Sequence, residues 1–395
     1  MEYTKRDTNI AKCLAVMLML AHHLFGSAEI MNQYGAGGLI PTDLLVTASH
    51  HFGKICVSVF IFLSGYGMTK SYNNRISKIG ASRLNAGETT RFILKRYISL
   101  EGGFLFVYLL SLIVITCCNP EKTASVYAVG NGNRYPVVGV IADALGLAYG
   151  FSTPSLNGTW WYMTIAFTAV LILPIAVITV KRYGAFAYLL PLLAVPFLGV
   201  HSEMISAYLS PMLLGVAAAE NDWLVKLKNW TGSGRRNERK HKPKATVRVI
   251  KCFAVLALII VFGYWRCTST EAWNVNRLDL LAESIQNTAL SFLLVYFCFD
   301  FISGGKGLSS AMAFIGRHAT NIFLVHTFIQ WNYATDEVFI YGLRYPLLIF
   351  IGLLGLSLAA LIIIEQLKRL TRYDRLLSAL RRKAAGQPGK AEQGK

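Results

Sequence analysis

The sequence is short of charge, and it lacks the cysteine spacing of a metal site. Charged residues make up 15% of its 395 residues, against about 25% in an ordinary soluble chain. This shortage excludes a disordered protein and argues against a soluble enzyme. None of the seven cysteines forms a CxxC pair and most lie in apolar runs, so we expect no bound metal and no disulfide scaffold. Ser64 has no surrounding GxSxG motif, so a serine nucleophile there has little support.

Apolar residues are abundant instead. They make up 54% of the chain and come in runs of about 20, the length that a helix needs to cross a bilayer. We therefore predict an all-α polytopic membrane protein with about ten transmembrane helices, multi-pass in what we expect to be a bacterial cytoplasmic membrane. The predicted spans are 8–26, 53–73, 100–118, 159–180, 183–200, 203–220, 249–266, 280–303, 309–333 and 341–365. Residues 137–151 are apolar but too short to span, so we expect an interfacial or re-entrant helix there.

The basic residues give an independent test of this topology. Of the 39 lysines and arginines, 29 fall in segments that alternate to one side of the ten spans, and three fall on the other. Cytoplasmic loops hold such an excess, so both termini are predicted to be cytoplasmic. We assign 1–365 to one membrane domain with a basic cytoplasmic loop at 221–248, and 366–395 to a basic cytoplasmic tail. The net charge of +18 follows from this topology and favours contact with membrane lipids, not with nucleic acid.

The first predicted span carries three ionisable residues, Lys12, His22 and His23. An ionisable side chain inside a membrane is costly, so each is a candidate functional residue. Lys12 and His23 are separated by about three turns plus 20°, so they share one helix face, with His23 about 16 Å nearer the outer surface. A histidine that only packs, and a lysine that only reaches the headgroup region, are the alternatives.

Polar or small residues in three other spans are further candidates. Ser64 and Gly65 lie in the second span, where close helix packing is the alternative to a role in a site. His326 lies in the outer third of the ninth span, at a depth similar to that of His23. Trp161 lies near an outer helix end, where an aromatic belt anchors many membrane proteins.

A cytoplasmic basic stretch contains Arg91, Lys95 and Arg96. Guanidinium groups bind phosphate through paired hydrogen bonds, so the stretch is a candidate phosphate site. Anchoring of the helix end by positive charge explains the same residues equally well.

Five blocks, in order, resemble the acyltransferase-3 family of integral membrane acyltransferases, over about 8–365. They are Lys12-x10-His23, Phe60–Tyr66, Lys95–Tyr97, Thr159–Tyr162 with Pro174 near the end of its helix, and Gly316–His326. The family usually has Arg where Lys12 stands, so the charge is kept and the bidentate fork is lost. The segment Thr164–Phe167 lacks the Glu that many members place after the Trp. We expect the stand-alone form, without the extracytoplasmic hydrolase-like domain of many members.

The resemblance implies an O-acyltransferase that moves an acyl group, usually acetyl, from cytoplasmic acyl-CoA to a hydroxyl of a cell-envelope glycan or glycolipid. Acyl-CoA is then a co-substrate, and no bound cofactor is expected. The resemblance implies His23 as the catalytic residue, acting as a base or as an acyl carrier. The residues implied to hold the CoA phosphates are Lys12, Arg91, Lys95 and Arg96, and those implied to line the path are Ser64, Gly65, Trp161 and His326.

Two other functions stay open at this point. A transporter or flippase of a glycan or acylated substrate would use the membrane His and Lys residues as a proton relay. The sequence offers it no acidic partner deep in the spans and no internal repeat. A non-catalytic partner in envelope assembly would dock through 221–248 or the tail, and no residue selects that function.

Overall fold

The computed structural model describes residues 2–35, 37–38, 40–129, 135–197, 203–231, 245–269 and 277–386. All regular secondary structure in these residues is helical, as an apolar solvent requires of a chain that must satisfy its own backbone hydrogen bonds. The contacts divide the chain into two compact units. Unit 1 comprises Met1–Ala28, Thr42–Asn73 and Leu173–Ala319, and unit 2 comprises Glu29–Pro41, Asn74–Ile172 and Thr320–Lys395.

Seven helical segments are long and apolar enough to cross a membrane. They are α1 (Lys5–Phe25), the run Thr42–Ile79, α5 (Ala86–Cys118), the run Gly158–Tyr183, α12 (Ala245–Thr268), the run Arg277–Ile302 and α16 (Pro346–Leu370). The all-helical membrane class is thereby confirmed, whereas the count of ten and the side of each terminus stay predictions. The predicted spans 183–200 and 203–220 correspond to the shorter apolar helices Phe186–Phe197 and Ala207–Glu220. Part of the basic loop (232–244) and the end of the tail (387–395) lie outside the described residues.

The continuous helix predicted over 309–333 is wrong, because the chain breaks at His318. Helix α14 (Gly307–Arg317) ends there, and α15 (Ala319–Trp331) begins at the next residue. The backbone of His318 leaves helical geometry, and its N–H bonds to the carbonyls of Gly316 and Ile315 in a tight turn. The break falls in a polar sequence and next to the boundary between the two units, which lies after Ala319.

Unit 1 is built from helices that approach one another closely at glycines. Its elements are α1, α3 (Thr42–Thr47), η1 (Ala48–Phe52), most of α4 (Ile55–Ile79), α9 (Phe186–Ala194), α10 (Glu203–Glu220), α11 (Trp223–Lys228), α12, α13 (Arg277–Phe297), η5 (Cys298–Ile302) and α14. Helices α1 and α14 cross where a Cβ on Gly316 would overlap the carbonyl oxygen of Asn9. Helices α4 and α10 cross where a Cβ on Gly65 would overlap the carbonyl oxygen of Met212. At the same crossing, a Cβ on Gly215 would overlap the carbonyl oxygen of Phe62. Small residues at such crossings let membrane helices pack through their backbones.

A buried ion pair joins α12 to η5 in unit 1. Lys251 Nζ lies 3.0 Å from Asp300 Oδ2, and both side chains are less than 10% exposed. The hydroxyl of Tyr296 donates a second hydrogen bond to the same carboxylate oxygen at 2.9 Å. A buried carboxylate needs such partners, because an unpaired charge away from water is costly.

Unit 2 is organised around α5. Its other elements are most of α2 (Ala28–Gln33), α6 (Pro120–Tyr127), α7 (Pro136–Ala144), η2 (Gly158–Trp160), the first half of α8 (Trp161–Tyr183), α15, η6 (Ile340–Leu343), α16 and α17 (Tyr373–Ala384). The short helix α7 is the predicted non-spanning segment. Its Asp143 is buried and accepts hydrogen bonds from Tyr127, Ser155 and the N–H of Leu156. This carboxylate therefore ties α6, α7 and the following loop together.

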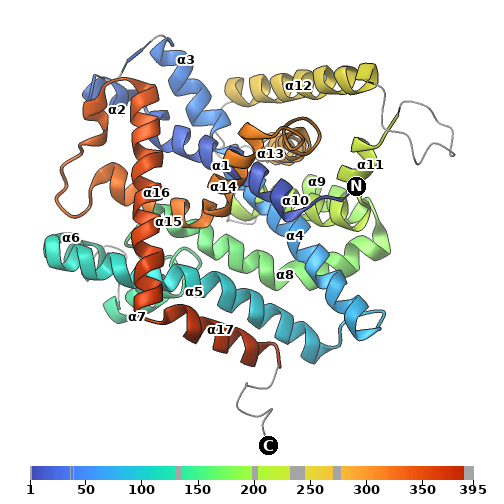
Figure 1. The fold of residues 1–395 in the computed structure, drawn as a ribbon, viewed down its shortest axis with the longest axis horizontal. Coiled ribbons are helices and arrows are strands. Elements are labelled where there is room, and N and C mark those ends of the chain that lie inside the picture. The colour runs from blue at the N-terminus through green and yellow to red at the C-terminus, as the bar shows by residue number, and fades with distance from the viewer. Residues whose placement is uncertain are drawn as a thin grey trace, which may run out of the picture. The chain divides into compact units, whose positions relative to one another are not determined.

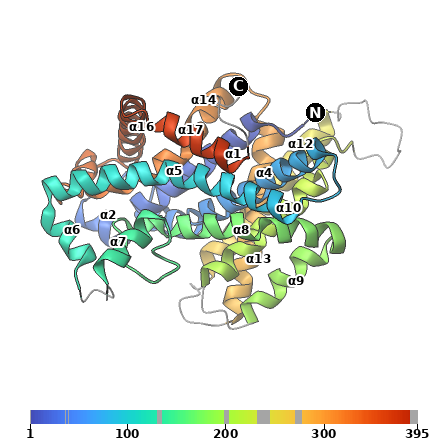
Figure 2. The ribbon, with the colours of Figure 1, turned by 90° about the horizontal axis from the view of Figure 1, so that it is seen from below.

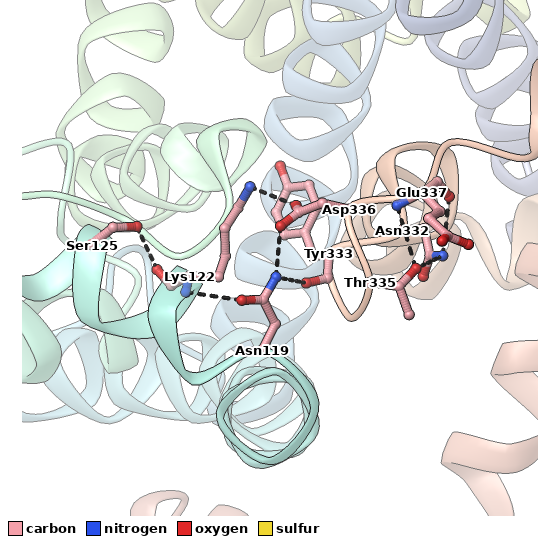
Figure 3. Close-up of polar contacts among 8 residues, drawn as sticks. All are labelled: Asn119, Lys122, Ser125, Asn332, Tyr333, Thr335, Asp336 and Glu337. Atoms are coloured by element: carbon pink, nitrogen blue, oxygen red, sulfur yellow. Dashed lines mark hydrogen bonds and ion pairs between the residues drawn. The ribbon is translucent and has the colours of Figure 1, made fainter.

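A polar clamp connects the α5–α6 junction to the loop after α15 (Figure 3). Asn119 caps α6 through its side-chain oxygen, and its Nδ2 donates to Asp336 Oδ2 at 2.6 Å. Lys122 Nζ reaches the other carboxylate oxygen of Asp336 at 2.9 Å and also lies over the ring of Tyr333. Asp336 adopts a left-handed backbone conformation with φ of 56°, which Asp tolerates better than most residues. The clamp fixes this turn against α6.

In the described part of the predicted tail, α16 ends at Leu370 and α17 follows it and lies beside α5 (Figures 1 and 2). Arg372, in a left-handed conformation, turns the chain sharply after α16. Leu377 then fills the space over Gly102, the ring of Tyr373 packs on Phe106, and Arg381 donates to the carbonyl of Ser99. In these three contacts the residue number increases along α17 while it decreases along α5, so the two helices run antiparallel.

Candidate functional site

Four histidines gather in unit 1 at the end of α1 and on η1, and we call them the histidine cluster: His22, His23, His50 and His51. The ring of His22 lies 5.1 Å from that of His23 and 5.7 Å from that of His50, between centroids. His51 lies 4.9 Å from His50. All four side chains are partly exposed. The cluster therefore brings four titratable rings together at one place in unit 1, none of them fully buried.

Two of these rings are fixed by reciprocal bonds between α1 and η1. His22 Nδ1 lies 3.1 Å from the carbonyl oxygen of Ser49, on η1. His50 Nδ1 lies 2.8 Å from the carbonyl oxygen of Gly26, which caps α1. A carbonyl only accepts, so each Nδ1 carries the hydrogen, and the lone pair of the neutral ring is on Nε2. This is the tautomer and orientation that a general base needs.

Gly53 makes room for this arrangement. A Cβ at Gly53 would lie 2.7 Å from the Cβ of His22 and 3.0 Å from the carbonyl oxygen of Leu18. Both contacts are shorter than van der Waals separation, so a larger residue would push η1 away from α1. His22 and its bond to Ser49 depend on this glycine.

A charged pair borders the cluster. Arg266 of α12 donates to Glu283 of α13 at 2.8 Å and to Gln286 at 3.3 Å. Its Nε also lies 3.5 Å from the carbonyl oxygen of His51. The side chain of Arg266 is 9% exposed, so its charge depends on Glu283. Glu283 falls inside the predicted span 280–303, near one end.

The sequence pattern did not predict that His50, His51, Arg266 and Glu283 lie together in one candidate site. A second His-His pair just before the block Phe60–Tyr66, matching the pair His22-His23, was the available signal. The neighbourhood of Arg266 and Glu283 has no comparable signal, because two helices must pack before these residues meet.

Lys12 lies in the first half of α1, whereas the histidine cluster lies at the other end of that helix. Its side chain is half-buried, and it forms no hydrogen bond or ion pair with any residue in the described part of the chain. A membrane lysine normally pairs or reaches water. An unpaired ammonium here is consistent with an anionic ligand.

Ser64 and Gly65 of α4 belong to the same unit. Ser64 Oγ donates to the carbonyl oxygen of Phe60 at 2.8 Å, one turn earlier in its own helix. Gly65 lies in the backbone crossing with α10. Both observations explain the residues by packing, and their role in lining a site stays a prediction.

The predicted phosphate-binding residues of unit 2 lie on the first turns of α5 but differ in their partners. Arg91 forms an ion pair with Glu88 at 2.7 Å, and Glu88 also binds Arg75. The guanidinium of Arg96 lies 5.5 Å above the ring of Phe92. Lys95 is exposed and, like Arg96, has no ion pair among the described residues. Lys95 and Arg96 therefore keep uncompensated charge.

Trp161 and His326, the remaining predicted residues, also belong to unit 2. Trp161 opens α8 and packs near Tyr149 and Tyr162. His326 is completely buried in α15, and its Nδ1 lies 2.8 Å from the carbonyl oxygen of Phe323. Unit 1 holds His23, Lys12, Ser64 and Gly65, so the structure describes the two groups of predicted residues separately.

No cluster of His, Cys, Asp or Glu in the described residues has the arrangement of a metal site. The four imidazoles are instead held by packing and by backbone carbonyls. These features define an integral membrane protein of many helices, with titratable rings on α1 and η1 and an unpaired lysine on α1.

The chain belongs to the acyltransferase-3 family, because the sequence model of that family's acyltransferase domain matches residues 6–365. The resemblance over about 8–365 is thereby confirmed. The match makes the protein a membrane acyltransferase. It ends before α17, so the helix beside α5 lies outside the shared domain. No curated protein and no solved structure was similar enough to the chain to be matched.

Proposed function

We propose that this protein is an O-acyltransferase that moves an acyl group, with acetyl as the expected one, from cytoplasmic acyl-CoA to a hydroxyl of a cell-envelope glycan or glycolipid. The bacterial cytoplasmic membrane is its proposed location. The observation that carries the proposal is the family match over 6–365 joined to a cluster of partly exposed imidazoles that contains His23. Acyl transfer to a hydroxyl needs a base, and imidazole accepts protons near neutral pH.

His23 is the proposed catalytic residue. As a base, it takes the proton of the acceptor hydroxyl while the oxygen bonds to the acyl carbon and the thiolate of CoA leaves. As a carrier, it first takes the acyl group on a ring nitrogen and then passes it to the acceptor. Its ring packs edge to face on His22, which is itself bonded to Ser49, so His23 rests on an ordered neighbour.

The phosphates of acyl-CoA are the proposed ligands of Lys12, Lys95 and Arg96, with Arg91 in support. The first three have no ion-pair partner in the described residues, so an anion would compensate them. Arg91 already shares Glu88 with Arg75 and would contribute less. Ser64, Gly65, Trp161 and His326 are proposed to line the path of the acyl group. Membrane lipids are the remaining proposed partners.

The test is transfer of labelled acetyl. Membranes containing the wild type or His23→Ala are incubated with acetyl-CoA labelled in the acetyl carbon, and label is then measured in lipid and glycan fractions. Label with the wild type alone supports acyl transfer that depends on His23 and identifies the acceptor fraction. Equal label with both variants, at equal amounts of inserted protein, would remove His23 from the chemistry.

A transport function makes a different prediction. Purified protein in vesicles would then move a labelled glycolipid across the bilayer in the absence of any acyl-CoA. No contact in the described residues favours that function, and the acyl-transfer assay separates the two.

A further inference from the structure

We propose that Arg381 of α17 is a further phosphate-binding residue, which joins Lys95 and Arg96 of α5 in holding the phosphates of acyl-CoA. This inference rests on the proposed acyl transfer and adds a residue to its donor site. Helix α17 begins after residue 365, where the match to the family ends. The assignment therefore comes from contacts within unit 2 and not from the family.

The end of α17 lies along the basic stretch of α5 (Figure 2). Arg381 Nη2 donates a hydrogen bond to the carbonyl oxygen of Ser99 at 3.4 Å. Just after the helix, a Cβ on Gly386 would lie 3.2 Å from Cζ of Arg91. These two contacts fall at either end of the segment Arg91–Ser99, which contains the predicted phosphate-binding residues of α5. The last turn of α17 therefore passes beside those residues.

Arg381 belongs to the face of α17 that packs on α5. The ring of Tyr373 packs on Phe106, with ring centroids 4.9 Å apart, and Leu377 fills the space over Gly102. Tyr373, Leu377 and Arg381 are four residues apart, and residues at this spacing lie on one face of a helix. The guanidinium is therefore held against α5 by the packing of two neighbours on the same face.

The other basic residues of α17 lie on different faces. Arg375, Arg382 and Lys383 are exposed, and a rotation of 100° per residue places each of them about 120° or more from Leu377. Cations in the last turn of a helix interact favourably with its dipole, which accounts for Arg382 and Lys383 on any face. The dipole does not account for a cation on the face that packs on α5.

The charge of Arg381 is the opposite of what packing alone would favour there. Lys95, Arg96 and Arg381 form no ion pair with any residue that the structure describes. Like charges on adjacent helices repel, so a carboxylate facing the basic stretch would stabilise the contact more. Arg381 brings a further positive charge instead. An anion bound beside the two helices would compensate all three cations.

The guanidinium of Arg381 also has an unmet donor. Its Nε is buried and has no hydrogen-bond partner among the described residues, and a buried donor without an acceptor is costly. Glu101 does not supply the acceptor. Its carboxylate is buried two residues after Ser99, and both of its oxygens also lack a hydrogen-bond partner in the described chain. Phosphate offers several acceptor oxygens in a geometry that matches the planar fork of a guanidinium.

The test is the affinity of the purified protein in detergent for CoA, the product that keeps the phosphates of the donor. Arg381→Gln removes the charge and the fork but keeps a hydrogen-bond donor for the carbonyl of Ser99. We expect it to bind CoA about 10-fold more weakly, because one hydrogen bond to a charged group contributes about this factor. Arg375→Gln removes the same charge from another face of α17 and should bind CoA like the wild type. Arg381→Lys, which keeps the charge and loses the fork, should bind CoA with an intermediate affinity.

Pantetheine separates phosphate recognition from a general loss of structure. It has the thiol arm of CoA without any phosphate, so Arg381→Gln and the wild type should bind it equally. Unfolding midpoints of the two proteins should agree within a few degrees. Equal affinities of the two proteins for CoA would overturn the assignment of Arg381. An equal loss of affinity for CoA and pantetheine in Arg381→Gln would overturn it as well, since the residue would then support only the structure.

A phospholipid headgroup carries the same chemistry as the donor phosphates. Protein purified from nanodiscs of phosphatidylcholine and phosphatidylglycerol distinguishes the two sources, because the retained phosphatidylglycerol can be measured by mass spectrometry. We expect the wild type and Arg381→Gln to retain equal amounts. Loss of this lipid in Arg381→Gln with unchanged affinity for CoA would overturn the assignment to acyl-CoA.

The failure of this inference and that of the proposed function give different results. A wild type that binds CoA and transfers labelled acetyl, with both properties unchanged in Arg381→Gln, overturns the role of Arg381 and leaves the proposed function intact. A wild type that neither binds CoA nor transfers labelled acetyl overturns the proposed function and this inference together.

Discussion

Lys122 Nζ lies 2.9 Å from Asp336 Oδ1 and joins α6 to the loop between α15 and α16. The hydrogen bonds from Lys122 and Asn119 lower the pKa of Asp336 below its usual value. The folded state therefore binds this proton less tightly than the unfolded chain does. The clamp contributes stability at every pH above the usual aspartate value of about 4. That contribution is lost as the pH falls through the lower pKa of the folded state.

We predict that Asp336→Asn destabilises the protein slightly at pH 7 and flattens the acid end of its stability curve. The pair is about half exposed, so its contribution is small, roughly 0.2–1 kcal/mol. Thermal unfolding midpoints in detergent, measured from pH 3 to pH 7 for the wild type and the variant, test this. Parallel curves over the whole range would contradict a role for the clamp. High salt should shrink the difference at pH 7, because exposed pairs are screened.

We predict that Gly316→Ala destabilises unit 1 and that Gly355→Ala does not. A Cβ on Gly316 would overlap the backbone of Asn9, so α14 must move away from α1. Overpacking of this kind costs about 1–3 kcal/mol, and backbone contact places it at the upper end. Gly355 lies in α16 with open space where its Cβ would be, which makes it a matched helical control. Equal unfolding midpoints for both variants would contradict the close crossing.

The buried pair Lys251–Asp300 predicts a strong coupling between two substitutions. Lys251→Met leaves the buried carboxylate of Asp300 with only the longer ion pair to Arg248, at 3.9 Å, and should cost roughly 3–5 kcal/mol. Asp300→Leu should be similarly harmful, because it leaves Lys251 unpaired. The double variant should recover most of the loss, since it removes both charges. Unfolding midpoints of the four proteins give the coupling. Additive losses would mean that the two residues act independently.

Part of this architecture could be predicted from residue order alone. Long apolar runs predicted the helices, and the interval between Lys12 and His23 placed both on one face of α1. The family blocks pointed to the same helix. These features depend on periodicity and length, which a single segment contains in full.

The rest depends on how segments meet, which periodicity does not report. His22 finds its acceptor 27 residues away at Ser49, and Arg266 finds Glu283 on another helix. The break at His318 was missed because the run 309–333 is mostly apolar, and its short polar stretch at 317–321 does not by itself end a helix. Competing polar contacts near residues 317–321, among them the bond from Asn321 to Glu365, arise only after packing.

Lys12 gives the sharpest contrast between stability and function. Its half-buried ammonium has no ion pair or hydrogen bond in the described residues, so it costs free energy in the absence of a ligand. Lys12→Met keeps the length of the side chain and removes the charge. We predict that it raises the free energy of unfolding of the ligand-free protein by roughly 1–3 kcal/mol, and with it the unfolding midpoint. Transfer from acyl-CoA should fall through a higher KM. Lys12→Arg, which keeps the charge, should retain most of the activity. A lower midpoint for Lys12→Met would show that Lys12 supports the fold, and an unchanged KM would show that it does not hold the phosphates of acyl-CoA.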